Sequence, residues 1–221
     1  MFHALMMAFV VAAGSATATG TMATTSHAPM AMPTPAAQPK PSAAEAAFIS
    51  SVSALLLAKY PTTKEAKAAG YIQLTRLEPT DHTYNYTTMT YDKIDRLHPN
   101  FLWFDRNNKL VGLDYEYPKW AWPKIPSATA YPVAASRWVT IQQHMHYAYR
   151  MGSGPVQTHG GPALPNLQKD PITAQELTAD KMLPKGATLV WAHFHPACWD
   201  LGFWLVPNPN GAFADLNPNV K

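Results

Sequence analysis

Charged residues are scarce in this chain, and cysteine is almost absent. Asp, Glu, Lys and Arg make up 14% of the 221 residues and leave a net charge of +3, whereas an average soluble domain is about 25% charged. Because no dense run of Lys and Arg is present, a surface that follows nucleic-acid phosphates is not expected. The single cysteine, Cys198, excludes an intramolecular disulfide, so the packed core must supply the stability.

The familiar catalytic signatures are missing as well. The sequence contains no G-x-S-x-G nucleophile elbow, no H-E-x-x-H zinc motif, no Walker A loop, no G-x-G-x-x-G loop and no C-x-x-C pair. These absences argue against the corresponding enzyme families, and they leave room for an unfamiliar enzyme.

The N-terminus has the layout of a secretory signal peptide. An apolar stretch over residues 4–13 precedes Ala16-Thr17-Ala18, which fits an A-x-A cleavage site. The stretch is shorter than the roughly 18 residues of a membrane span. His3 stands where Lys or Arg is usual, and a disordered apolar tail is the alternative. We expect residues 1–18 to be a signal peptide, the protein to be secreted or periplasmic, and the mature chain to lack a transmembrane segment.

Two further regions follow. Residues 19–41 are rich in Pro, Ala and Thr without an apolar period, which predicts a disordered tether. Residues 42–221 carry apolar periodicity throughout and predict a single globular domain. Proline, 21 of 221 residues, is about twice as frequent as usual and favours short elements joined by stiff loops.

The periodicity of this domain predicts an α+β fold. Capping boxes at Ser42–Glu45, Thr62–Glu65 and Thr173–Glu176 each predict the start of a helix. Alternation with a period of two predicts strands, which we place at 101–104, 110–115, 137–151, 187–195 and 199–206, with a Gly/Pro loop over 152–171. We expect a mostly antiparallel, curved or barrel-like sheet with a few short helices at the N-terminus and edges.

Histidine provides the clearest chemical signal. The sequence contains two H-x-H pairs, His144/His146 and His193/His195. Residues i and i+2 of a strand project to the same side, so each pair directs two imidazoles at one region. Imidazole is a good ligand for Zn and Cu. If the two strands are neighbours, all four rings converge on a metal site; otherwise each pair has a structural role.

Other candidate residues have two interpretations. Cys198 is either a thiolate ligand close to His195 or a buried small hydrophobic residue, and the habits of free cysteine favour burial. Asp114 and Glu116 share a strand face, as paired acid–base groups do. Together with Asp200, they are equally compatible with exposed, solubilising carboxylates.

Three segments resemble a family of secreted bacterial proteins of unknown function. They are KYPTTKEAKAAGY (59–71), LVGLDYEYP (110–118) and CWDLGFWLVPNPNGAFADLNP (198–218). The resemblance spans roughly residues 45–220 and implies no activity. Cys198 and Gly202 stand where the family pattern has histidines, whereas Asp200 and Trp204 match it, so a histidine site does not carry over from the family.

The sequence therefore supports three functions. The first is an exported protein that binds a transition metal, Zn or Cu, through the paired H-x-H strands. The second is a non-catalytic module that binds an apolar or carbohydrate small molecule in an aromatic cleft. The third is a metal-dependent enzyme of an unrecognised kind.

The signal-peptide hypothesis predicts a mature N-terminus near Thr19, because signal peptidase cleaves after the small-residue motif. The intact mass of the protein from its native host should match a chain that begins there, and the protein should be in the exported fraction. Retention of Met1 in a cytoplasmic fraction would contradict export.

Overall fold

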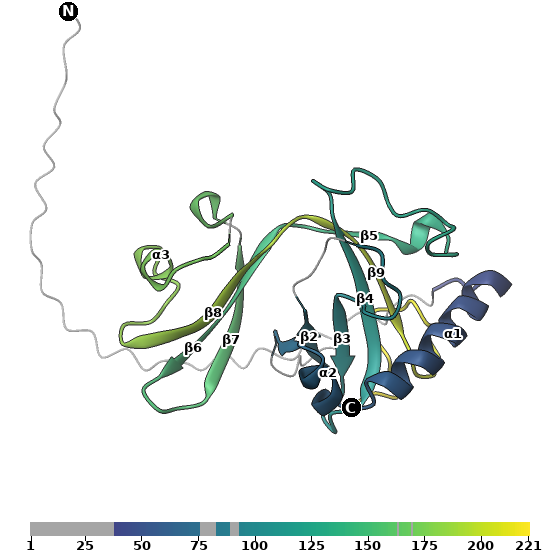
Figure 1. The fold of residues 1–221 in the computed structure, drawn as a ribbon, viewed down its shortest axis with the longest axis horizontal. Coiled ribbons are helices and arrows are strands. Elements are labelled where there is room, and N and C mark those ends of the chain that lie inside the picture. Colours follow the sequence, from purple (N-terminus) through teal and green to yellow (C-terminus); the bar gives the residue numbers. More distant parts are fainter. Residues whose placement is uncertain (1–37, 76–82, 89–92, 163, 169) are drawn as a thin grey trace, which may run out of the picture. The chain divides into compact units, whose positions relative to one another are not determined.

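The computed structural model describes residues 38–75, 83–88, 93–162, 164–168 and 170–221 (Figure 1). The expected signal peptide and nearly all of the expected tether lie outside these residues. The helices are α1 (Ala43–Lys59), α2 (Thr63–Ala68) and α3 (Ala174–Ala179), with short 3-10 turns at Ala135–Arg137 and Pro165–Leu167. The strands are β1 (Ile72–Gln73), β2 (Tyr84–Thr87), β3 (Phe101–Phe104), β4 (Leu110–Pro118), β5 (Val139–Ile141), β6 (His144–Met151), β7 (Val156–Pro162), β8 (Ala187–His195) and β9 (Cys198–Trp204).

The helices begin where the sequence predicted. All three capping boxes are formed, with the Ser or Thr side chain accepting from the backbone of the first turn and the Glu carboxylate accepting from the N-cap N–H. The tight turn after α2 places Gly70 at a φ of 93°, a conformation that favours glycine. Local sequence chemistry is sufficient for these elements.

Six strands form one antiparallel sheet in the order β1-β2-β3-β4-β9-β5. The two long central strands, β4 and β9, pair over seven residues from Gly112↔Trp204 to Pro118↔Cys198. Because opposite residues of paired strands project to the same face, this register decides which side chains meet.

The two faces of this sheet differ in chemistry. One face carries Tyr115, Tyr117, Leu201 and Phe203, which pack with Phe48 of α1 and other buried residues into the main hydrophobic core. Figure 1 shows α1 running beside β4 and β9. The residues of β4 and β9 that alternate with these core residues project to the other face. They include Asp114, Glu116, Asp200 and Cys198.

A second sheet contains three antiparallel strands in the order β7-β6-β8. It has its own core, built around Met145, Tyr147 and Leu177. Strand β8 leads directly into β9 through Pro196 and Ala197 (Figure 1), so the two sheets share a continuous stretch of chain. The α+β class with antiparallel sheets is thus confirmed, and the described strands form two open sheets without closing into a barrel.

Two local predictions were wrong. Residues 137–151, expected as one strand, divide into the end of a 3-10 turn, β5 and β6, and the two strands belong to different sheets. Residues 156–162, expected within a loop, form β7, because pairing along β6 overrides the poor strand propensity of Gly160 and Gly161. In β8, strict alternation of side chains would place Leu189 on the same face as Trp191. The register shifts by one residue there, pairing Tyr149 with Leu189 and Ala148 with Trp191. The extra residue turns Leu189 into the core of the smaller sheet.

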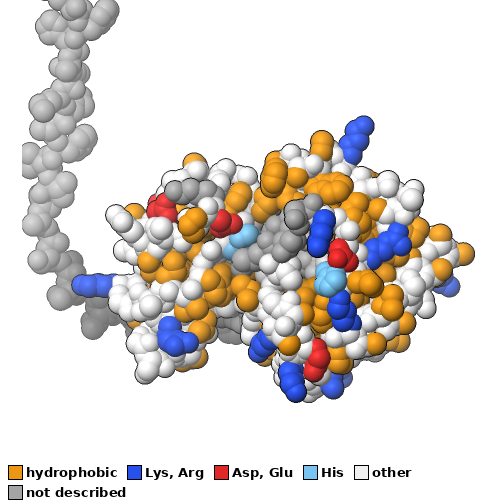
Figure 2. Space-filling view, in the orientation of Figure 1, with side chains coloured by type: hydrophobic (Ala, Val, Ile, Leu, Met, Phe, Trp, Pro, Cys, Tyr) orange, Lys and Arg blue, Asp and Glu red, His pale blue; other side chains and the backbone are white. Residues whose placement is uncertain are grey.

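The surface reflects the low charged fraction. On the face drawn in Figure 2, hydrophobic and uncharged side chains predominate, and several of the few charged ones gather with a histidine right of centre. Within the described part of the chain, no helix has the length and hydropathy needed to cross a membrane.

Glu45 ties the start of α1 to a distant loop. Its carboxylate accepts hydrogen bonds from the backbone N–H groups of Ser42 (2.7 Å) and Ala134 (3.1 Å) and from Arg137 Nε (3.1 Å). Burial alone would raise its pKa, but the hydrogen bonds from Arg137, Ser42 and Ala134 lower it from 4.5 to about 2. The ionised form is therefore stabilised by folding.

This carboxylate predicts a specific loss of stability in acid. Because the pKa of Glu45 is lower in the folded than in the unfolded chain, its contribution is complete above pH 4.5 and disappears as the pH falls toward 2. We expect Glu45→Gln to lower the free energy of unfolding by up to about 3 kcal/mol at pH 7, and by much less at pH 3. Denaturant titrations at both pH values measure this.

Glu65→Gln is the matched control, because Glu65 closes the corresponding capping box of α2, is only half-buried and makes its hydrogen bonds within that box. The pKa of Glu65 is also lowered, mainly by the hydrogen bond from the Thr62 hydroxyl, but Glu65 has no buried Arg partner, so the loss of stability at pH 7 should be smaller than for Glu45→Gln. An equal loss in both variants would show that capping, and not the buried ion pair with Arg137, accounts for the effect.

Candidate metal centre

The register of β6 against β8 brings the two histidine pairs together. His144 lies opposite His195, and His146 lies opposite His193. Since directly opposite residues of an antiparallel pair share a face, the four imidazoles gather on one side of the smaller sheet. The expectation that the two H-x-H strands are neighbours is confirmed.

His144 and His146 form the closest histidine pair. Their Nε2 atoms are 2.8 Å apart, and Nδ1–H of His144 donates to the carbonyl of Gln142 at 2.8 Å. Burial lowers the pKa of both rings, with neighbouring imidazoles adding to the effect, and takes that of His146 to about 3. Both rings are therefore neutral at physiological pH, the state in which imidazole binds metals.

His193 is oriented by a carboxylate that the sequence analysis did not consider. Its Nδ1 lies 2.9 Å from Oδ2 of Asp170, whose Oδ1 accepts from the backbone N–H of Phe194. Burial lowers the pKa of His193, although Asp170 opposes this. A carboxylate on one ring nitrogen is the usual support of a metal-binding histidine, because it sets the tautomer of the ring.

His195 connects the histidines to the six-stranded sheet. Its Nε2 lies 2.7 Å from Oε2 of Glu116 on β4, and its Nδ1 donates to the carbonyl of Pro196 at 2.9 Å. Burial would lower its pKa, but the hydrogen bond and charge of Glu116 raise it overall. The ring also stacks on His144, with 4.3 Å between centroids and 18° between planes.

Cys198 completes a compact group around this ion pair. Ligand atoms of Glu116, His195 and Cys198 all lie within 4.8 Å of one another, and all three residues are buried. The cysteine is fully buried, and burial raises the pKa of its thiol strongly. The burial expected of Cys198 is confirmed, and its sulfur lies within reach of two possible metal ligands.

A second compact group shares Glu116. Ligand atoms of Asp114, Glu116 and Asp200 also lie within 4.8 Å of one another. These carboxylates are not the exposed solubilising groups considered above, since Glu116 and Asp200 are 6% and 8% exposed. Burial, reinforced by the charges of Asp114 and Glu116, raises the pKa of Asp200 well above its ordinary value.

Sequence reasoning found part of this arrangement. Of the four predicted histidines, only His195 belongs to one of the compact groups within the described residues. Glu116 was noticed for sharing a face with Asp114, but its proximity to His195 follows from the pairing of β4 with β9. Asp170, in a loop before Pro171, gave no signal in the sequence.

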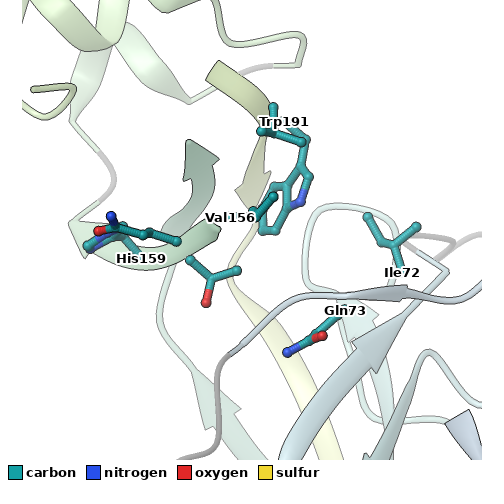
Figure 3. A pocket seen from close by; sticks show the side chains of 8 residues that line it. Ile72, Gln73, Val156, His159 and Trp191 are labelled. Atoms are coloured by element: carbon teal, nitrogen blue, oxygen red, sulfur yellow. The ribbon is translucent and has the colours of Figure 1, made fainter. Parts of the chain in front are cut away.

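A cavity of about 420 Å³ is lined by residues other than the four histidines. It is lined by Ile72 and Gln73 of β1 and by residues of β7 and β8. Figure 3 shows Trp191 beside Val156, with Ile72 and Gln73 across the cavity. Trp191 is its only large aromatic side chain among the described residues, so the aromatic cleft of the alternative function is limited to one indole ring.

No family model matches this chain, and neither the curated proteins nor the solved structures searched contain a match to it. The resemblance to a secreted bacterial family stays a prediction. The function must therefore be argued from the arrangement of the side chains.

The burial of Cys198 predicts an unreactive thiol. In chelator-treated, folded protein, a thiol reagent should modify Cys198 at least about 100-fold more slowly than in denatured protein, because reaction requires the thiol to become exposed and ionised. Absorbance of the released chromophore measures both rates. Rapid modification of the folded, metal-free protein would contradict the buried position.

Proposed function

We propose that this protein binds a transition metal ion, Zn²⁺ or copper, with His195, Cys198 and Glu116 as the first ligands and the neighbouring histidines as the source of the others. The observation that carries the proposal is the buried triad, whose ligand atoms lie within 4.8 Å of one another. Imidazole, thiolate and carboxylate together form a set typical of zinc, and a His/Cys combination also suits copper.

The geometry of His195 supports this role. Its Nε2 and the Glu116 carboxylate are 2.7 Å apart, and a proton now joins them. Metal bonds of about 2.0–2.1 Å at tetrahedral angles place two ligand atoms roughly 3.3 Å apart. A metal can therefore replace the proton if the two side chains separate by about half an ångström, while the Pro196 carbonyl keeps hold of Nδ1–H.

The remaining ligands are expected from histidines 144, 146 and 193. The Nε2 atoms of His144 and His146 are already close together, and His144 lies against His195. His193 carries its own supporting carboxylate, Asp170. The proposal thus retains the four-histidine set predicted from the sequence, and adds Cys198 and Glu116 to it.

Export belongs to the same proposal. A thiolate and imidazole site in a secreted or periplasmic protein would serve to bind, store or present a metal, and a metal-dependent reaction is the remaining alternative. The cavity beside Trp191 favours a small-molecule ligand as a second candidate, but one indole ring provides a single stacking surface.

The proposal predicts one tightly bound transition metal per chain. Untagged protein dialysed against Zn²⁺ or copper should retain about one equivalent by elemental analysis. His195→Ala and Cys198→Ser should each weaken the affinity at least about 100-fold, because each removes a ligand. Co²⁺ in the same site should give a sulfur-to-metal charge-transfer band that Cys198→Ser abolishes. Affinity should rise with pH, since the ligands must lose protons.

His98→Ala is the control, because His98 is an exposed histidine that contacts Asp95 and belongs to neither compact group of ligand atoms. It should leave the metal content unchanged. Single variants His144→Ala, His146→Ala and His193→Ala then show which histidines are ligands. The proposal is wrong if the wild-type protein retains no metal, or if His98→Ala loses as much as His195→Ala.

A further inference from the structure

Asp114, Glu116 and Asp200 form a cluster of three carboxylates. The proposed transition-metal site uses only one of them, Glu116. All three residues lie on the face of the six-stranded sheet opposite the aromatic core. Asp200 pairs directly with Glu116, and Asp114 pairs with Gly202, the next residue of β9 on that face. Strand pairing therefore assembles three acidic side chains at one place, with ligand oxygens within 4.8 Å of one another.

Asp200 supplies an independent sign of a missing ligand. The residue is more than nine-tenths buried, and its Oδ1 has no hydrogen-bond partner among the described residues. Buried polar atoms in folded proteins nearly always have a partner, since an unsatisfied one carries the full cost of desolvation. The side chains that act on Asp200 among the described residues are the carboxylates of Asp114 and Glu116, and Asp114 also shares a hydrogen bond with it. No cationic side chain is among them, so an ion pair does not account for the buried Asp200.

The scaffold around Asp114 holds its carboxylate in position. Trp103 Nε1–H donates to Asp114 Oδ2 at 2.6 Å. Two glycines make room for this pair, because a Cβ at Gly112 would lie 2.1 Å from the Trp103 ring and one at Gly202 would lie 2.4 Å from Asp114 Oδ1. Asp114 Oδ1 thus lies directly over Gly202. Gly202 is the neighbour of Asp200 on the same face of β9.

We propose that Asp114, Glu116 and Asp200 bind a second cation, an oxygen-preferring divalent ion of the Mn²⁺, Mg²⁺ or Ca²⁺ class. Such ions prefer carboxylate oxygens, whereas the group with His195 and Cys198 offers nitrogen and sulfur. Glu116 belongs to both groups, so its carboxylate bridges the two ions. This inference rests on the proposed function only where it gives Glu116 two ions to bind. The argument for the carboxylate site itself depends on Asp114 and Asp200.

Mn²⁺ is the probe, because its paramagnetism reports binding directly. The mature chain, first loaded with one equivalent of Zn²⁺, is titrated with Mn²⁺, and free Mn²⁺ is followed by its electron paramagnetic resonance signal. The wild-type protein should bind one Mn²⁺. Asp200→Asn should weaken Mn²⁺ binding at least about tenfold and retain Zn²⁺, since a neutral amide replaces a charged ligand of the same shape.

Cys198→Ser should show the opposite pattern, losing Zn²⁺ and keeping Mn²⁺, and Glu116→Gln should weaken both. Glu65→Gln, which removes a carboxylate of α2 outside both groups, should change neither. Near-ultraviolet circular dichroism checks that each variant is folded. If Asp200→Asn fails to fold, Asp114→Asn takes its place, with Trp103 still able to donate to the amide oxygen.

The outcomes separate the two proposals. Zn²⁺ retention without a Mn²⁺ site, or Mn²⁺ binding that Asp200→Asn and Asp114→Asn leave unchanged, overturns the second site alone. Mn²⁺ binding that depends on Asp200 in a protein that retains neither Zn²⁺ nor copper supports the carboxylate site and overturns the proposed function.

Discussion

The contact between Glu116 and His195 is the interaction on which the rest of this site depends. It joins β4 of the larger sheet to the end of β8 in the smaller one, at 2.7 Å and between two buried side chains. A buried charge that loses its partner costs about 3–5 kcal/mol, so neither residue is easily replaced alone. Both compact groups of ligand atoms contain Glu116, and the stack of His144 on His195 extends the cluster to the paired histidines.

The alternation of side chains in β4 and β9 separates stability from chemistry. Tyrosines, leucine and phenylalanine on one face join the hydrophobic core under α1, where aromatic rings meet edge to face. The other face is left free to carry the carboxylates and the thiol. Burying acidic side chains costs free energy because they lose their hydration. The burial of apolar side chains in the main core offsets this cost, so the sheet tolerates the acidic residues.

Burial has two consequences for a metal site of this kind. It keeps His144 and His146 neutral, so that their lone pairs are available, and it raises the pKa of the Cys198 thiol, which must lose its proton to bind. The second effect opposes binding, and a bound cation counters it by stabilising the thiolate. For the proposed site we therefore expect selectivity for a thiophilic ion, since a weakly bound hard ion would not displace that proton.

The sequence by itself determined the local features of this protein. Helix starts at Ser42, Thr62 and Thr173 follow from side chains that cap backbone groups within three residues, and the shared face of each H-x-H pair follows from the two-residue period of a strand. The helix starts and the shared histidine faces depend only on residues close together in the chain, so the sequence alone predicts them.

Only the tertiary structure decided which strands are partners and in what register. The pairing of β6 with β8 brings His144 opposite His195, and the pairing of β4 with β9 brings Glu116 opposite Asp200, across more than eighty residues of chain in the second case. β7 and the register shift before Trp191 likewise depend on a partner strand. A shift of one residue would turn every one of these side chains to the other face, so the candidate site exists only in the register that the packed core selects.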